Sequence, residues 1–325
     1  MVLKADWEKA NDVTSIDDNI VKMMVSKALP EQSLSSYQII SGGCANLNIK
    51  LNFCGDITPL ILRIYLRDKE AASREQKLAK LVHQNIPVAQ IIYIGNLDRY
   101  KYAIMQFIDG ITLRDLLISG RDEDIDNILF ETGTILAKMQ KFTFDRQGEF
   151  DKNLNITPFP QGYDYILFAR QCMKNQWIIS TFSDKDRIRI LKNIINNADY
   201  FPDKTDNTLT HGDYDPANIL VHKVSGKWQI SAILDWEFAH SGSLLQDIAN
   251  MLRYSHQLPD FFEEQFLHGL SESGVMLPGH WRKATYLLNL LALLDYLQRY
   301  DPLSRPKRLL DIKKLIEYIN KKLEK

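Results

Sequence analysis

The residues best placed to do chemistry lie in one segment, 209–250, which reads LTHGDYDPANILVHKVSGKWQISAILDWEFAHSGSLLQDIAN. Within it Asp213 is followed by Asn218, and Asp235 comes after two apolar stretches that a Ser-Gly turn separates. Two strands joined by a tight turn form a hairpin, and the outer ends of a hairpin lie together. We therefore expect the side chains of Asn218 and Asp235 to be neighbours.

This set of side chains has the chemistry that phosphoryl transfer needs. A carboxylate beside an amide oxygen suits Mg²⁺, which takes few protein ligands and completes its shell with phosphate oxygens. Asp213, in a turn just before Asn218, is placed to accept a hydroxyl proton or to align an attacking oxygen. Each residue alone is more often a turn former. A transition-metal site at His211 and Asp213 is disfavoured because no other His or Cys stands nearby at ligand spacing.

Composition excludes several other classes of protein. The chain has 325 residues, 45% hydrophobic and 25% charged, enough for a large core. Its 40 basic and 41 acidic residues argue against a protein that grips nucleic acid, and we expect no such partner. The most apolar stretch, 284–297, is broken by Asn289 and Asp295 and is too short to span a bilayer, so we expect no membrane partner. Three cysteines without pairing or zinc spacing, and no signal peptide, favour a cytoplasmic protein.

Elements rich in strand formers come first, and helical patterns follow. We expect an early helix over 20–28 and another over 71–83, and strands over 37–40, 47–53, 60–66, 91–94 and 102–107. Beyond an Asp-Gly turn, helices are expected from 113, over 128–141 and over 306–325, with the hairpin strands at 219–222 and 228–234. We expect a first lobe over residues 1–107 and a second over 108–325.

The pattern His-Gly-Asp with Asn218, followed by Ile-Leu-Asp-Trp-Glu at 233–237, resembles the aminoglycoside phosphotransferase and choline kinase family of small-molecule kinases. The resemblance implies an α+β, protein-kinase-like fold of two lobes. It implies a small mixed β-sheet in the N-terminal, nucleotide-binding lobe. The C-terminal lobe would be larger, mainly helical, and would carry catalysis and the acceptor site.

The resemblance also implies a role for each residue of the motif. Asp213 would be the catalytic base or hydroxyl-orienting residue, and Asn218 and Asp235 would hold Mg²⁺. His211 and Asp247 would support the catalytic loop structurally rather than take part in the chemistry.

The first lobe should then supply the nucleotide contacts. Glycines in the turn at 41–46 would let backbone N–H groups approach phosphate oxygens. A cation between apolar strand residues needs an anionic partner, and Glu75 is the candidate partner of Arg63 by analogy with the kinase Lys–Glu pair. Backbone groups at a hinge would contact the base, whether of ATP or of GTP. The expected nucleotide-binding residues are Gly42, Gly43, Asn46, Arg63, Glu75, Gln106 and Ile108.

We predict an ATP- or GTP-dependent, Mg²⁺-requiring kinase that transfers the γ-phosphoryl group to a hydroxyl of a small molecule. No Arg precedes Asp213, and no Asp-Phe-Gly or Ala-Pro-Glu follows, so a protein acceptor is disfavoured. The alternatives are a catalytically inactive nucleotide-binding relative and, more remotely, a metal-dependent hydrolase.

The acceptor site is less defined by the sequence. The candidate acceptors are aminoglycoside-like molecules, amino alcohols and other metabolites. The near-zero net charge of the chain argues against a strongly cationic antibiotic as the acceptor. Aromatic residues of the second lobe fit either a cation cage or core packing. Asp295 fits a pocket carboxylate or a buried, hydrogen-bonded one. The sequence assigns neither substrate-binding residues nor an oligomeric state.

Overall fold

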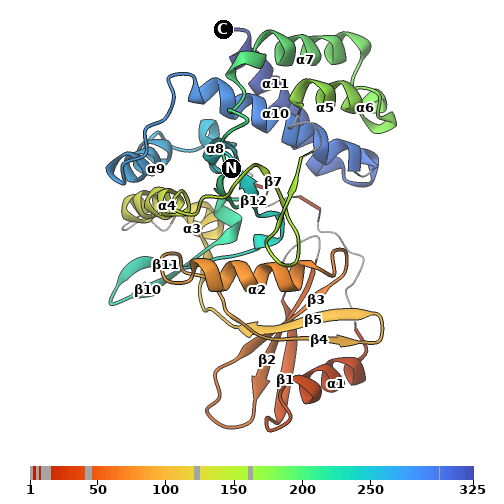
Figure 1. Ribbon diagram of the computed structural model, residues 1–325, viewed down its shortest axis with the longest axis vertical. Helices are drawn as coiled ribbons and strands as arrows, with labels where there is room; N and C mark the ends of the chain where they lie inside the picture. The colour runs from red at the N-terminus through yellow and green to blue at the C-terminus, as the bar shows by residue number, and fades with distance from the viewer. Residues whose placement is uncertain are drawn as a thin grey trace.

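The computed structural model describes residues 3–4, 7–8, 16–40, 46–120, 125–159, 164–299 and 301–325. The chain forms a β-sheet lobe and a larger helical lobe, with α2 (Ala71–Val82) lying between them (Figure 1). Gly42 and Gly43, the expected phosphate-contacting glycines, lie outside the described residues. Among the described helices, none is both long and apolar enough to cross a membrane.

The first lobe is built on a five-stranded sheet in the order β1-β2-β3-β5-β4. Every described strand pair in it is antiparallel, so this sheet is antiparallel where a mixed one was expected. Successive side chains of a strand point to opposite faces of the sheet, and a different helix covers each face. Leu62 and Ile64 pack against the helix α1, whereas Tyr65 packs with the first turn of α2. The bounds are α1 (Asp18–Ala28), β1 (Leu34–Ile40), β2 (Asn46–Phe53), β3 (Leu60–Tyr65), β4 (Ile91–Leu97) and β5 (Tyr100–Gln106).

Two small sheets lie where the lobes meet. One has the order β11-β10-β6 and contains the predicted hairpin, and the other has the order β8-β7-β12-β9. Both position short loops beside the sheet lobe rather than forming a core of their own. Their strands are β6 (Ile111–Thr112), β7 (Gly148–Phe150), β8 (Ile156–Pro158), β9 (Thr208–Thr210), β10 (Ile219–Val224), β11 (Lys227–Ile233) and β12 (His240–Gly242).

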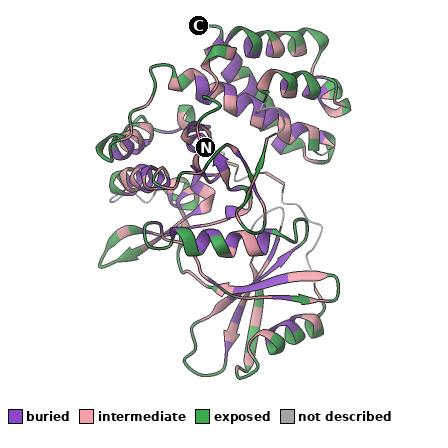
Figure 2. Ribbon diagram, viewed as in Figure 1, coloured by how far each residue is buried: buried purple, intermediate pink, exposed green. Residues whose placement is uncertain are grey.

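The second lobe is mainly helical, and its buried residues gather where the helices face one another (Figure 2). α4 and α9 approach closely at Gly133 and Gly269. A Cβ on Gly269 would lie 2.0 Å from the carbonyl oxygen of Phe130. The α-helices of this lobe are α3 (Leu113–Ser119), α4 (Ile125–Met139), α5 (Tyr165–Cys172), α6 (Gln176–Thr181), α7 (Asp184–Asn196), α8 (Leu244–Leu252), α9 (Phe261–Glu272), α10 (Trp281–Arg299) and α11 (Pro306–Leu323). The 3-10 helices are η1 (Ala198–Tyr200), η2 (Pro216–Asn218), η3 (Trp236–Phe238), η4 (Ser255–Gln257) and η5 (Pro302–Ser304).

The two-lobed α+β fold and the expected elements are confirmed, with bounds that shift by a few residues. The chain leaves the five-stranded sheet at Gln106, next to the division expected between residues 107 and 108. The first described residues, however, contact the second lobe. Leu3 belongs to its core, and Trp7 Nε1 donates a hydrogen bond to Asp311 on α11 at 2.8 Å.

Candidate active site

The loop 211–218 is braced from behind by α8. The backbone N–H groups of His211 and Gly212 donate to the two carboxylate oxygens of Asp247, at 2.7 and 2.9 Å. Burial outweighs these hydrogen bonds and raises the pKa of Asp247 to about 7. Gly212 has φ +83°, and a Cβ there would lie 2.5 Å from the carbonyl oxygen of Phe238, so the turn requires glycine.

The imidazole of His211 joins this loop to the end of β11. Its Nε2 lies 2.9 Å from the carbonyl oxygen of Leu234, and its Nδ1 accepts from the backbone N–H of Asp213 at 3.3 Å. A neutral ring with the proton on Nε2 satisfies both contacts. Burial lowers the pKa of His211, which keeps the ring neutral. His211 therefore connects the loop to the end of β11, and it is not among the described residues that line the cavity.

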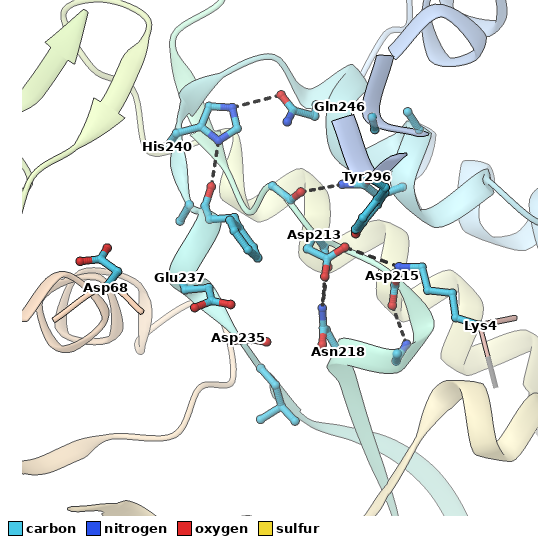
Figure 3. A pocket seen from close by; sticks show the side chains of 18 of the residues that line it. Lys4, Asp68, Asp213, Asp215, Asn218, Asp235, Glu237, His240, Gln246 and Tyr296 are labelled. Carbon is cyan, nitrogen blue, oxygen red and sulfur yellow. Dashed lines mark hydrogen bonds and ion pairs between the residues drawn. The ribbon is translucent and has the colours of Figure 1, made fainter. Parts of the chain in front are cut away.

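Asp213 faces the cavity and is held by Asn218. The amide Nδ2 of Asn218 donates to the backbone oxygen of Asp213 at 2.8 Å and to its Oδ2 at 3.0 Å (Figure 3). On the other side, Lys4 Nζ lies 3.7 Å from Asp213 Oδ1 and forms an ion pair with Asp215. Burial alone would lower the pKa of Lys4, but these two carboxylates outweigh it and raise the pKa.

The hairpin places Asp235 next to Asn218, as predicted. Ile219 pairs with Ile233 in the β10–β11 register, and the Leu234 N–H donates to the Asn218 carbonyl at 2.8 Å. Asp235 follows with φ 65°, a left-handed conformation that is costly for a residue with a Cβ. Among the described residues, none donates a hydrogen bond to its buried Oδ1. A strained backbone and a carboxylate oxygen without a hydrogen bond therefore occur together at Asp235.

Three acidic side chains, Glu75, Asp235 and Glu237, form what we call the carboxylate cluster. Burial and then the neighbouring carboxylates raise the pKa of Glu237 to about 7, against the effect of Arg63 and a hydrogen bond from Asn46 at 3.2 Å. Burial also raises the pKa of Glu75, helped by Asp235 and opposed by Arg63. Arg63 forms ion pairs with Glu75 and Asp235 of this cluster. Burial and the carboxylates raise the pKa of Glu75 and of Glu237 although the guanidinium lies beside them.

The predicted ion pair between Arg63 and Glu75 is present. Alternation along β3 turns Arg63 and Tyr65 toward α2, which carries Glu75. Arg63 Nη1 lies 3.1 Å from both Glu75 carboxylate oxygens, and the Tyr65 hydroxyl donates to Glu75 at 2.8 Å. Nη1 also lies 3.5 Å from Asp235 Oδ1. Burial alone would lower the pKa of Arg63, but Glu75 and Asp235 raise it. The guanidinium thus links α2 to the cluster.

A cavity of about 1240 Å³ runs along these residues between the lobes. At the sheet end it passes the hinge, where the Gln106 N–H donates to the Gln90 carbonyl at 3.0 Å. Gln106 and Ile108 both line the cavity at this end. The apolar walls at this end are Ile40, Ile61, Ala89, Met105, Leu220 and Leu234.

Beyond Asp213 the same cavity enters the second lobe, in what we call the helical compartment. Its walls come from α5, α8, α10 and α11 and from the first described residues. They are Lys4, Trp7, Tyr165, Phe168, Asp213, Asp215, Asn250, Arg253, Leu288, Leu291, Ala292, Asp295, Tyr296, Arg299 and Arg308. Lys4, Asp213, Asp215 and Tyr296 converge in this region (Figure 3). The cavity therefore has an apolar end and a charged end, with Asp213 between them.

Most of the expected site residues come together, although not all reach the cavity. Its lining includes Arg63, Gln106, Ile108, Asp213, Asn218 and Asp235. Asn46, Glu75, His211 and Asp247 are instead in contact with residues of the site and act behind it.

Sequence reasoning did not assign Glu237, Lys4 or Arg253. Glu237 belongs to the Asp-Trp-Glu motif that the sequence singled out, and it lies in the short 3-10 helix η3 that directly follows Asp235. Lys4 and Arg253 offered no local signal. Lys4 meets Asp215 across most of the chain, and Arg253 reads as one more basic residue at a helix end.

The fold and the site together define a kinase-like phosphotransferase architecture. The profile described as the phosphotransferase enzyme family (APH) matches residues 36–287, and the chain belongs to this family. No curated protein matches the sequence.

Solved structures share the fold at low sequence identity. The chain is similar to the aminoglycoside phosphotransferase APH(4)-Ia, with 16% identity, a TM-score of 0.69, and coverage of 93% of this chain and 97% of the other. It is also similar to aminoglycoside 2'-phosphotransferase-IIIa in its GDP complex, with 17% identity, a TM-score of 0.70, and coverage of 94% and 99%. A ternary complex of an APH(4)-Ia mutant with AMP-PNP and hygromycin B gives 17% identity, a TM-score of 0.65, and coverage of 93% and 97%.

Proposed function

We propose that this protein is an ATP- or GTP-dependent, Mg²⁺-requiring kinase that phosphorylates a hydroxyl group of a small molecule. The observation that carries the proposal is the juxtaposition of Asp213, Asn218 and Asp235 at the midpoint of the cavity. The apolar end past the hinge has the character of a base site. The helical compartment on the other side of Asp213 provides room for an acceptor.

The residues fit a magnesium ion. The amide nitrogen of Asn218 is used on Asp213, which leaves its oxygen as a ligand. Asp235 offers a buried oxygen without a hydrogen bond, and Glu237 adds a carboxylate whose raised pKa reports excess negative charge. These three side chains would hold Mg²⁺, which when bound neutralises phosphate charge. We include Glu237 on the basis of its place in the carboxylate cluster.

The reaction is a single displacement at phosphorus. The acceptor hydroxyl oxygen forms a bond to the γ-phosphorus, the bond from that phosphorus to the bridging oxygen breaks, and the nucleoside diphosphate leaves. The hydroxyl proton passes to the carboxylate of Asp213, which Asn218 and the braced loop hold in place. Arg63, fixed by Glu75, lies beside Asp235 to offset phosphate charge. Positioning and electrostatics supply the catalysis.

We place the division of labour between the nucleotide lobe, residues 1–107, and the catalytic and acceptor lobe, residues 108–325. Arg63 and the hinge come from the first, and Asp213, Asn218 and Asp235 come from the second. The residues around Lys4 are an exception, since they serve the second lobe.

A screen for diphosphate release tests the proposal. Purified protein is incubated with Mg²⁺ and ATP or GTP and with aminoglycosides, amino alcohols, amino acids, hydroxy acids, sugars, sugar phosphates and nucleosides. At least one class should stimulate ADP or GDP release, and Asp213→Asn should reduce that release by roughly 10²- to 10⁴-fold. Unchanged turnover in Asp213→Asn would show that the role assigned to Asp213 is wrong. Nucleotide-dependent thermal stabilisation with no stimulated release would indicate a non-catalytic nucleotide-binding protein.

A further inference from the structure

Arg253 is a buried cation in the wall of the helical compartment. It follows the last residue of α8, and 4% of its surface is exposed. Its Nε donates to Asn289 Oδ1 at 2.8 Å, and its Nη2 donates to Asn250 Oδ1. The third nitrogen, Nη1, is buried and has no hydrogen-bond partner among the described residues. No carboxylate of the described residues forms an ion pair with this guanidinium.

The two partners of Arg253 are neutral and fixed in orientation. Asn289 Nδ2 donates to the Ala249 carbonyl at 2.7 Å, and Asn250 Nδ2 donates to the Gly212 carbonyl at 2.9 Å. Each amide nitrogen is thereby committed, so each amide oxygen must face Arg253. These contacts hold the guanidinium in one orientation without neutralising its charge, and they do not use Nη1.

A buried guanidinium without a negative partner is costly, because amide dipoles replace only part of its hydration. Arg is also the side chain whose planar fork best fits a carboxylate or a phosphate. A rigid, desolvated and unneutralised Arg with one unused nitrogen is therefore the arrangement expected of an anion-recognition site.

The other cations of the compartment differ from Arg253 in having partners. Lys4 pairs with Asp215, and Arg299 pairs with Asp295. Asp215 and Asp295 are therefore already paired with cations of the protein and are not free to bind a cationic acceptor. Among the described residues assigned to the compartment, four are cations, Lys4, Arg253, Arg299 and Arg308, and three are carboxylates, Asp213, Asp215 and Asp295.

Two hydrogen bonds connect Arg253 to the loop that carries Asp213. Asn250 connects Arg253 to the carbonyl of Gly212, the residue before Asp213. Arg253, Asp213 and Tyr296 all line the same cavity. An acceptor that reached both would carry its anionic group close to its reactive hydroxyl.

We propose that Arg253 binds an anionic group of the acceptor, so that the substrate is a small hydroxylated molecule bearing a carboxylate or a phosphate. This inference rests on the proposed kinase function and identifies its acceptor class. Arg253 determines specificity, and polycationic acceptors are disfavoured at the same place.

The test uses acceptor pairs that differ mainly in charge: hydroxy acids with their amides, and sugar phosphates with the free sugars. The anionic member of at least one pair should have a kcat/KM at least tenfold above its neutral partner. Arg253→Gln should raise KM for the anionic member roughly 10- to 100-fold and for the neutral member less than about threefold. Which pair responds identifies the anion as carboxylate or phosphate.

Two further variants separate recognition from loss of structure. Arg282→Gln removes one positive charge from α10 outside the cavity, where Arg282 pairs with Glu263 on α9, and should change KM for the anionic acceptor less than about threefold. Arg253→Lys keeps the charge without the fork and should give an intermediate KM. An equal loss of kcat for anionic and neutral acceptors in Arg253→Gln, with KM unchanged, would mean that Arg253 only braces the loop, which overturns the proposal. Preference for neutral or cationic acceptors also overturns it, while leaving the kinase function intact.

Binding measurements test the anion site without turnover. Glycolate and inorganic phosphate are titrated calorimetrically in saturating Mg²⁺ and ADP, which fill the nucleotide region. At least one probe should bind, and its affinity should fall at least tenfold in Arg253→Gln. This result in a protein that turns over no acceptor would support the anion site and reject the kinase function. Failure of both probes to bind, or equal binding to Arg253→Gln, overturns the anion site.

Discussion

Asp235→Asn should make the protein more stable in the absence of metal and nucleotide, while it removes activity. The substitution keeps the shape of the side chain and removes one negative charge from the carboxylate cluster. Arg63 loses its longer ion pair with Asp235, at 3.5 Å, but keeps its hydrogen bonds to Glu75, so the contact that joins β3 to α2 survives. Glu237 then has one carboxylate neighbour fewer.

The magnitude follows from the pKa of Glu237, which is raised from 4.5 to about 7. Such a shift corresponds to about 3 kcal/mol of unfavourable free energy for the ionised side chain. Burial is the largest cause and remains in the variant, so we assign the smaller part, about 1 kcal/mol, to Asp235. A carboxyl with a raised folded-state pKa costs stability as pH rises through that pKa. The gain in Asp235→Asn should therefore be larger at pH 8 than at pH 5.5.

Urea denaturation at both pH values measures the stability, and thermal shifts with Mg²⁺ and ATP measure ligand binding. Asp235→Asn should show a higher urea midpoint at pH 8 without ligands, and little extra stabilisation by Mg²⁺ with ATP. Asp295→Asn is the matched control, because that carboxylate lines the cavity but is paired with Arg299. It should show no such gain. A variant Asp235→Asn that is less stable at pH 8 and still binds Mg²⁺ and ATP normally would refute the reasoning.

Three further predictions concern the framework of the site. Burial lowers the pKa of His211 below its ordinary 6.5, so the unfolded chain binds the proton first and stability should fall as pH drops below about 6.5. The urea midpoint should fall less in His211→Gln between pH 7.5 and 5.5, and an equal fall would contradict this assignment. Gly269→Ala should lower the free energy of unfolding by roughly 1–3 kcal/mol, since the new Cβ meets the backbone of Phe130; an unchanged urea midpoint would show that α4 and α9 can separate freely. Glu75→Gln should cost roughly 3 kcal/mol in urea denaturation by leaving Arg63 without its main partner. Adding Arg63→Met should restore much of that stability but not diphosphate release, and a double variant as unstable as the single one would argue against the pair.

The parts of the site that the sequence predicted are those set by local pattern. The apolar neighbours of Arg63 in its strand predicted an anionic partner, and the analogy with the kinase Lys–Glu pair named Glu75 as that partner. The hairpin signal placed Asn218 beside Asp235 because strand register is fixed by the turn and the apolar alternation. Local pattern did not determine how the strands of the first sheet pair, and the expected mixed sheet is antiparallel.

The parts that the sequence did not predict depend on contacts between distant segments. Lys4 reaches Asp215 because Leu3 and Trp7 contact the helical lobe, Leu3 in its core and Trp7 through the hydrogen bond to Asp311. The significance of Arg253 lies in what surrounds it: two amides with committed nitrogens and no carboxylate partner. A basic residue at a helix end carries no trace of this environment in the sequence.

The transfer of labelled phosphate in a single turnover tests the central claim most directly. Protein in excess over [γ-³²P]ATP, or labelled GTP, is mixed with Mg²⁺ and the acceptor class that the release screen identifies, and the products are separated. The account predicts that the label moves to an acceptor hydroxyl in the wild-type protein and that Asp213→Asn slows this step by at least 10²-fold. Label that appears only as inorganic phosphate, or transfer at the wild-type rate in Asp213→Asn, would contradict the account.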